Sequence, residues 1–285
     1  MRYLIILIMI PVIQFVISFL GQEFLPAQNS FLLRYGSYFL QQFFAVFVPT
    51  YFLFKKESYL TKEECNPNGY TNLLRFAVMG ICLQFLGIFI NMPFSVMLQK
   101  LGYSVPPSFA PAKTFPQFLI QTLALCLTPA IFEEVLFRRM IFGSIRKKSG
   151  IAAILYSALF FSMAHIDFFN LPATFFIGIC LGIMRYRKTP LILCIVAHFF
   201  VNFSATGLNI LLSNPAISDF FTRYFLLFLM VFLMVFISCF PKKRNPEVLT
   251  ETSLNRFGIY TLKLLKNPLF YTYILLFVIL GVHNL

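Results

Sequence analysis

The sequence has 285 residues, of which 59% are hydrophobic and 12% are charged. Water-soluble domains carry about a quarter of their residues as charges. This composition therefore excludes a soluble domain, a disordered chain and a secreted disulfide scaffold. The apolar runs are continuous and do not alternate at every second residue, which argues against an outer-membrane barrel.

The apolar runs predict about nine transmembrane helices, because a helix needs ~20 residues to cross ~30 Å of hydrocarbon. In chain order, the expected spans are residues 3 to 20, 31 to 54, 73 to 98, 115 to 143, 150 to 166, 168 to 186, 190 to 212, 219 to 241 and 267 to 282. We expect an all-α, polytopic bundle in three parts. Helices 1–3 lie within residues 1–114, a core of helices 4–7 within 115–212, and helices 8–9 within 213–285.

Basic residues predict the orientation of this bundle. All but four of the 23 Lys and Arg residues fall in loops on one side of the expected spans, the exceptions being Arg34, Lys100, Lys113 and Arg223. Since basic loops favour the cytoplasmic side, we expect an integral membrane protein with a cytoplasmic N-terminus. The net charge of +13 then reflects topology and contact with the lipid bilayer, and we expect no nucleic-acid partner.

The cysteines and glycines within the spans predict packing. The six cysteines are scattered and include no C-x-x-C pair, which argues against a disulfide framework and against a thiolate metal site. Gly178 and Gly182 form a G-x-x-x-G pattern on the sixth expected span. Small residues at this spacing favour close approach of two helices.

Ionisable residues inside the spans are the informative ones, because a charge at the centre of a membrane helix costs at least ~2.5 kcal/mol. Span 4 contains Glu133, Glu134 and Arg138. Span 5 ends at His165, and span 7 carries His198. These are two of the three histidines in the chain. Their occurrence together indicates one functional site within the central spans.

Helix geometry assigns different roles to the two glutamates. Glu134 and Arg138 are four residues apart, so they share a helix face and can form an ion pair. Glu133 projects about 100° away and lacks a partner on its own helix. Spans 4 and 5 form a hairpin around Ser149, with Glu133 and His165 at equal distances along its two arms. We therefore expect these two side chains to lie at the same level, with His198 slightly closer to the cytoplasm. Pro129 is expected to bend span 4.

These residues resemble the CPBP family of CAAX-type and bacteriocin-processing intramembrane proteases, also called Abi proteins. The family pattern is E-E-x-x-x-R, then F-x-x-x-H, then H-x-x-x-N, on successive core helices. Here the pattern is carried by Glu133, Glu134, Arg138, Phe161, His165, His198 and Asn202. The match covers roughly residues 115 to 210, about a third of the chain.

The resemblance implies an intramembrane endopeptidase that cleaves a membrane-associated peptide or protein. Glu133 would be the general base that activates water, and His165 would hold and polarise that water. His198 and Asn202 would donate hydrogen bonds to the developing oxyanion. Glu134 and Arg138 would brace the site. The resemblance also favours a bacterial cell membrane as the location.

Other mechanisms and functions stay open. We expect no cofactor, although Glu133, His165 and His198 are acceptable ligands for Zn²⁺. An H-E-x-x-H motif, which would favour zinc, is missing from the sequence. The main alternative function is a non-proteolytic bacteriocin-immunity or membrane regulatory protein in which the motif is a scaffold. A proton-coupled transporter is a weaker alternative, because no inverted repeat is evident in the sequence.

Overall fold

The computed structural model describes residues 2–24, 31–54, 72–104, 112–212, 214–241 and 251–283, and this part of the chain contains helices and no strand. The helices before the central region are α1 (Tyr3–Phe24), α2 (Phe31–Gln41), the π-helical segment η1 (Gln42–Phe47), α3 (Val48–Phe54) and α4 (Leu73–Lys100). The central region comprises α5 (Phe115–Thr122), η4 (Leu123–Leu127), α6 (Thr128–Glu133), η5 (Glu134–Ile141), α7 (Phe142–Arg146), α8 (Gly150–Ala164), α9 (Leu171–Tyr186) and α10 (Leu191–Leu212). The last helices are α11 (Pro215–Arg223), α12 (Phe225–Cys239), α13 (Glu251–Leu265) and α14 (Pro268–His283). The expected all-α class is confirmed.

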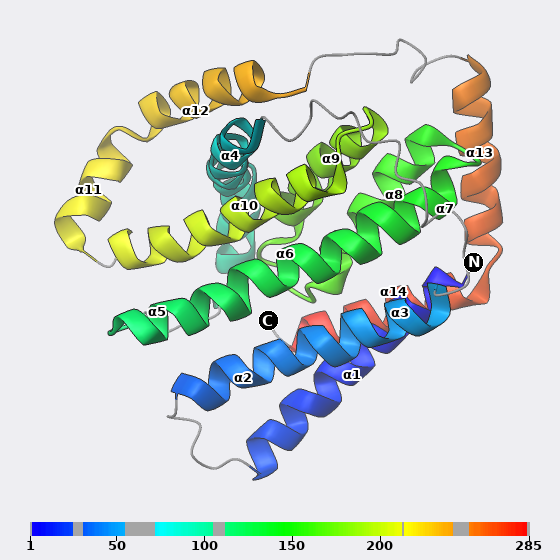
Figure 1. The fold of residues 1–285 in the computed structure, drawn as a ribbon, viewed down its shortest axis with the longest axis horizontal. Helices are drawn as coiled ribbons and strands as arrows, with labels where there is room; N and C mark the ends of the chain where they lie inside the picture. Colours follow the sequence, from blue (N-terminus) through cyan, green and yellow to red (C-terminus); the bar gives the residue numbers. More distant parts are fainter. Residues whose placement is uncertain are drawn as a thin grey trace.

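The central helices lie between two outer groups. In Figure 1, α1, α3 and α14 lie together on one side, and α5 to α8 run through the middle. On the other side, α9 and α10 pack against α4, which also contacts α12. One buried apolar cluster joins α1, α8, α13 and α14, and a second joins α4, α9 and α10. The polar residues of the motif therefore lie between two hydrophobic cores.

The expected count of nine spans is not confirmed. Among the described residues, four helices are long and apolar enough to cross a membrane, or up to six if two bent pairs each count as one span. Those pairs are α11 with α12, bent by 72°, and α13 with α14, bent by 75°. Helices α8 and α9 have 15 and 16 residues, which is fewer than the ~20 needed to cross. Several apolar segments thus form shorter or bent helices that hydropathy alone reads as full spans.

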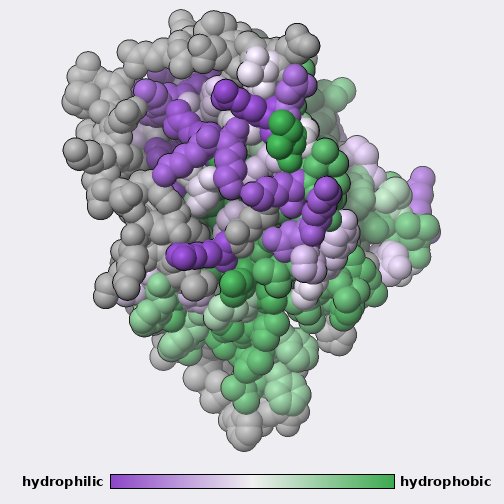
Figure 2. All heavy atoms as spheres, turned by 90° about the vertical axis from the view of Figure 1, so that its right-hand side faces the viewer, coloured by the Kyte–Doolittle hydropathy of each residue, from purple (hydrophilic) through white to green (hydrophobic). Residues whose placement is uncertain are grey.

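Hydrophilic residues gather at one end of the bundle. Figure 2 shows this end, with hydrophilic residues in its upper part and a hydrophobic part below. The exposed side chains at the α7–α8 and α9–α10 turns include Arg146, Lys147, Lys148 and Lys188. The sequence places all four on the expected cytoplasmic side. The basic residues at 55, 56, 62 and 242–244 lie outside the described residues, and the orientation itself stays a prediction.

Close packing of α9 on α8 depends on Gly178. A Cβ atom at this position would lie 2.9 Å from Cα and 3.0 Å from Cβ of Ala158. A Cβ at Gly182 would lie 3.4 Å from Cα of Ile154. The G-x-x-x-G pattern therefore lies on the face of α9 that packs against α8. The carbonyl of Gly178 also accepts a hydrogen bond from Arg138 Nη2 at 3.4 Å, so this contact is linked to the charged residues in the bundle.

We predict that Gly178→Ala destabilises the protein by about 1–3 kcal/mol, because the added methyl group overfills a close helix contact. The matched control is Gly207→Ala on α10, where nothing lies within 4 Å of the added Cβ. That control is expected to be neutral or to stabilise its helix by up to about 1 kcal/mol. Thermal unfolding of both variants in the same detergent measures the difference, and equal midpoints would contradict the prediction.

Candidate active site

Glu133 and Glu134 stand at the junction between α6 and the π-helical segment η5. A second π-helical segment, η4, precedes α6, and Pro129 lies in the first turn of α6. The Thr128 hydroxyl donates to the carbonyl of Leu123 at 2.8 Å. π-Helical turns are rare and frequently occur at functional sites. The helix changes type on either side of Pro129 but continues from Phe115 to Arg146, and the bend expected at Pro129 stays a prediction.

Glu134 is the centre of a buried ionic network. Its Oε1 lies 3.3 Å from Nη1 of Arg138 and 2.9 Å from Nδ1 of His198. The side chains of Glu134 and Arg138 are both fully buried. The guanidinium of Arg138 also lies 4.3 Å from the ring centroid of Phe161. Since a buried charge is costly unless it is paired, these contacts account for the presence of both residues in an apolar interior.

Glu133 points to a different set of partners, as the helix geometry predicts. Its Oε2 lies 3.8 Å from Nε2 of His165 and 3.9 Å from Nε2 of His198. Separations of this size fit polar groups that share a water molecule between them. The sequence predicts that His198 lies slightly closer to the cytoplasm than Glu133. The ring of His198 nevertheless comes within 3.9 Å of Glu133. One carboxylate oxygen thus faces two imidazole nitrogens from two other helices.

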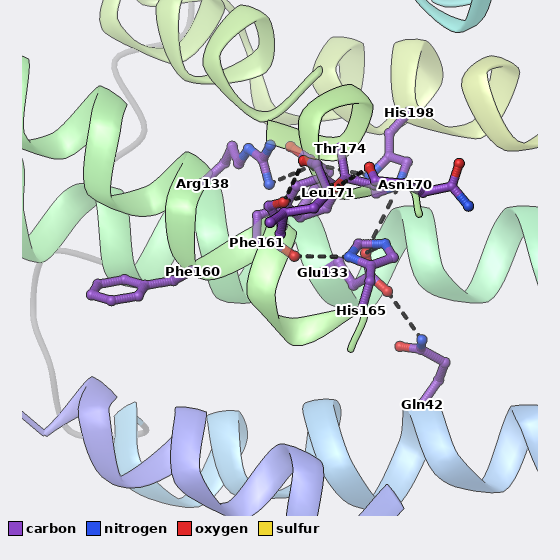
Figure 3. A network of polar contacts seen from close by, with 12 residues as sticks. Gln42, Glu133, Arg138, Phe160, Phe161, His165, Asn170, Leu171, Thr174 and His198 are labelled. Atoms are coloured by element: carbon purple, nitrogen blue, oxygen red, sulfur yellow. Dashed lines mark hydrogen bonds and ion pairs between the residues drawn. The ribbon is translucent and has the colours of Figure 1, made fainter. Parts of the chain in front are cut away.

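Hydrogen bonds at the other ring nitrogens orient both histidines. Nδ1 of His165 bonds to the carbonyl oxygen of Phe161 at 2.8 Å. A carbonyl only accepts, so this Nδ1 carries a proton and donates it, while Nε2 faces Glu133. Nδ1 of His198 bonds to Glu134 Oε1 at 2.9 Å. Figure 3 shows Glu133, His165 and His198 grouped around this position.

Phe161 packs against the charged and imidazole groups of the site. Its ring lies edge-on to the rings of His165 and His198, with centroids 4.8 and 5.5 Å apart, respectively. The guanidinium of Arg138 lies over the face of this ring, and the backbone carbonyl of Phe161 accepts a hydrogen bond from Nδ1 of His165. The phenylalanine of the F-x-x-x-H pattern therefore contacts three of the polar residues directly.

Asn202 is the one motif residue that the described contacts do not bring into this group. It lies on α10 one turn after His198, and its side chain is half-buried. The structure gives its backbone carbonyl a hydrogen bond from Thr206. Within the described part of the chain, its side-chain amide makes no hydrogen bond to Glu133, His165 or His198. Its assignment to the oxyanion stays a prediction.

A cavity of about 640 Å³ opens beside Glu133 and His165. Most of its other lining residues come from α1, α2 and η1, including Gln14, Gln41 and Gln42. Nε2 of Gln42 donates to Oε1 of Glu133 at 3.0 Å, a contact that the sequence analysis missed. The available signal was a pair of adjacent glutamines, Gln41 and Gln42, in an otherwise apolar span. The cavity is large enough to admit a segment of peptide to the carboxylate.

The described residues contain no group of three His, Cys, Asp or Glu side chains arranged to hold a metal ion. In particular, the three alternative zinc ligands Glu133, His165 and His198 do not form such a group.

Comparison with known families gives one match. Residues 115–204 match the family model described as type II CAAX prenyl endopeptidase Rce1-like. The matched segment contains every residue of the three-part motif, and the resemblance to the CPBP family is confirmed for it. Comparison with curated proteins and with solved structures found no match.

Proposed function

Since residues 115–204 carry the Rce1-like, CPBP-type pattern, we propose that this chain is an intramembrane endopeptidase in which Glu133 activates a water molecule. The match supports a CAAX-type intramembrane protease at the level of the family, and the helices able to cross a membrane support an integral membrane protein. The observation that carries the mechanism is the position of Glu133 Oε2, which faces Nε2 of His165 at 3.8 Å and of His198 at 3.9 Å beside the cavity.

The first step of the proposed reaction is attack of water on the scissile carbonyl carbon. Water held between Glu133 Oε2 and the two imidazoles gives one proton to Glu133 as its oxygen bonds to that carbon. Nε2 of His165 accepts the second hydrogen of the water and so fixes its orientation. The carbonyl π-bond opens, and its electron pair moves onto the oxygen to form an oxyanion.

The oxyanion needs hydrogen-bond donors in a water-poor site, where such donors are most effective. His198 donates from Nε2 when its ring carries both protons, because Nδ1 is already bound to Glu134. Asn202 is the second proposed donor. Collapse of the intermediate breaks the C–N bond, and Glu133 returns its proton to the leaving amine.

The proposed substrate is a membrane-associated peptide or protein that reaches the cavity from the bilayer. Glu133 and His198 are buried, whereas about a third (34%) of the His165 side chain is exposed where the cavity meets the site. The proposed location is a bacterial cell membrane with the N-terminus in the cytoplasm.

The test uses the full chain reconstituted in lipid nanodiscs and two internally quenched reporters. One reporter is a peptide with a farnesylated cysteine near its C-terminus, and the other is an unprenylated apolar peptide of the same length. We expect cleavage of at least one reporter, undiminished by 1,10-phenanthroline, and a loss of about 10²-fold or more in His165→Ala. Cleavage that is lost with the chelator and restored by Zn²⁺ would instead establish the metal mechanism.

The outcome also separates proteolysis from a non-proteolytic role. If neither reporter is cleaved, and Glu133→Gln and His165→Ala keep the cellular phenotype of the wild type, the protein acts as an immunity or regulatory protein and the proposal is wrong.

A further inference from the structure

The residue that contacts the general base from outside the matched segment is Gln42. It begins the π-helical segment η1, more than seventy residues before the Rce1-like match starts. Its Nε2 donates to Oε1 of Glu133 at 3.0 Å. Figure 3 shows Gln42 on a neighbouring helix, extended across the gap toward Glu133 and His165. Oε1 of Glu133 therefore has a donor from an N-terminal helix, while Oε2 faces the two core histidines and has no hydrogen-bond partner among the described residues.

Aromatic packing fixes the approach of Gln42. The rings of Phe43 and Phe47, on the same π-helical segment, lie with their centroids 6.3 and 4.9 Å from the ring of Phe132. Phe132 directly precedes Glu133 in the chain. These ring contacts pack η1 against α6 next to the hydrogen bond, and so bring the backbone of Gln42 within reach of Glu133.

A purely structural role explains Gln42 poorly. The residue sits in an apolar run, and its Oε1 is buried with no hydrogen-bond partner among the described residues. A buried polar atom without a partner lowers stability, whereas an apolar side chain of the same shape would not carry this cost. The part of Gln42 that is satisfied is the half that binds Glu133. Gln41, next to it, instead donates to Ser18 Oγ at 3.0 Å, and within the described residues it makes no hydrogen bond to Glu133.

We infer that Gln42 is a positioning residue for the general base. Its amide holds Oε1 of Glu133, so the carboxylate is oriented with Oε2 toward His165, His198 and the water between them. This inference rests on the proposed function of Glu133. It extends the machinery beyond residues 115–204, because the matched core alone does not contain the donor that orients its base. The second expected span, residues 31 to 54, then serves catalysis as well as packing.

The test is Gln42→Met, which keeps the length and apolar stem of the side chain and removes the donor. We expect kcat to fall by about 10- to 100-fold, the equivalent of one hydrogen bond to a charged group, with KM within about threefold of the wild type. The matched control is Gln84→Met, a half-buried glutamine on α4 away from the cavity. If Gln42→Met keeps a kcat within twofold of the wild type, and cleavage still depends on Glu133, then Gln42 is not a positioning residue. The proposed function of Glu133 would stand in that case.

A second arm does not depend on a substrate. In the wild-type background, Gln42→Met is expected to lower the Tm, because Glu133 loses a buried donor. In the Glu133→Ala background, the same substitution is expected to cause no such decrease. Tm shifts that simply add in the double variant would show that the two side chains are not coupled, and would overturn the inference. Absence of any cleavage that depends on Glu133 would overturn the proposed function, and the catalytic part of this inference with it.

Discussion

Replacement of Glu133 by glutamine is expected to lower the cleavage rate by about 10²- to 10⁴-fold, the usual contribution of a general base. Glutamine keeps the size of the side chain but cannot take a proton from water. The amide also changes the pattern of donors and acceptors toward His165 and His198, which lie 3.8 and 3.9 Å from the present carboxylate oxygen. The measurement is kcat in nanodiscs with the reporter that the wild type cleaves.

The control for this variant is Asp219→Asn, which makes the same carboxyl-to-amide change at an exposed position. Asp219 pairs with Arg223 at 3.3 Å, and both side chains are largely exposed. This control is expected to keep the wild-type rate, while thermal unfolding reports whether Glu133→Gln is folded. A folded Glu133→Gln protein with more than a tenth of the wild-type kcat would contradict the assignment of Glu133 as the base.

Replacement of Arg138 by methionine is expected to reduce the free energy of unfolding by about 3–5 kcal/mol, because it leaves a buried carboxylate without its cation. Arg138 is fully buried, lies 3.3 Å from Glu134, and stacks on Phe161. Methionine replaces much of the apolar stem but none of the charge. Thermal or chemical unfolding in a single detergent measures the change.

The chain offers a matched control in the exposed pair of Asp219 and Arg223, which has the same spacing of four residues and the same 3.3 Å distance. Arg223→Met is expected to cost less than about 1 kcal/mol, because exposed ion pairs contribute little. The double variant Glu134→Gln with Arg138→Met is expected to recover part of the loss, since the uncompensated charge is then removed. Equal effects of the buried and exposed arginines would contradict the ionic account of this network.

Much of the site was predictable because it depends on local helix geometry. The separation of four residues predicts the pairing of Glu134 with Arg138, and the offset of Glu133 predicts that it faces other partners; both are observed. Equal arms of the hairpin around Ser149 predict that Glu133 and His165 lie at one level, and their side chains do meet. These inferences needed only the helix repeat and an antiparallel turn.

Contacts between distant helices were not predictable in the same way. Gln42 and Glu133 are joined by the packing of η1 on α6 through Phe132, and no periodicity within either helix encodes that pairing. The nine-span count depended on hydropathy, which does not report that α11 and α12 bend by 72° or that α8 ends at Ala164. The π-helical segments also left no signal, because Pro129 predicts an irregularity but not its type.

The π-helical segment η5 has a consequence for the register of the long helix in which it lies. It begins directly after Glu133 and contains both Glu134 and Arg138, so the residues of the ion pair lie within it and Glu133 lies just before it. Removal of a single residue between Glu134 and Arg138 would rotate the following part of the helix by about 100°. Arg138 would then turn away from Glu134 and from the carbonyl of Gly178, while Glu133 kept its place. The spacing between the two glutamates and the arginine therefore ties the contacts of the site to helix length, and a deletion between residues 134 and 138 is expected to break the ion pair of Glu134 with Arg138.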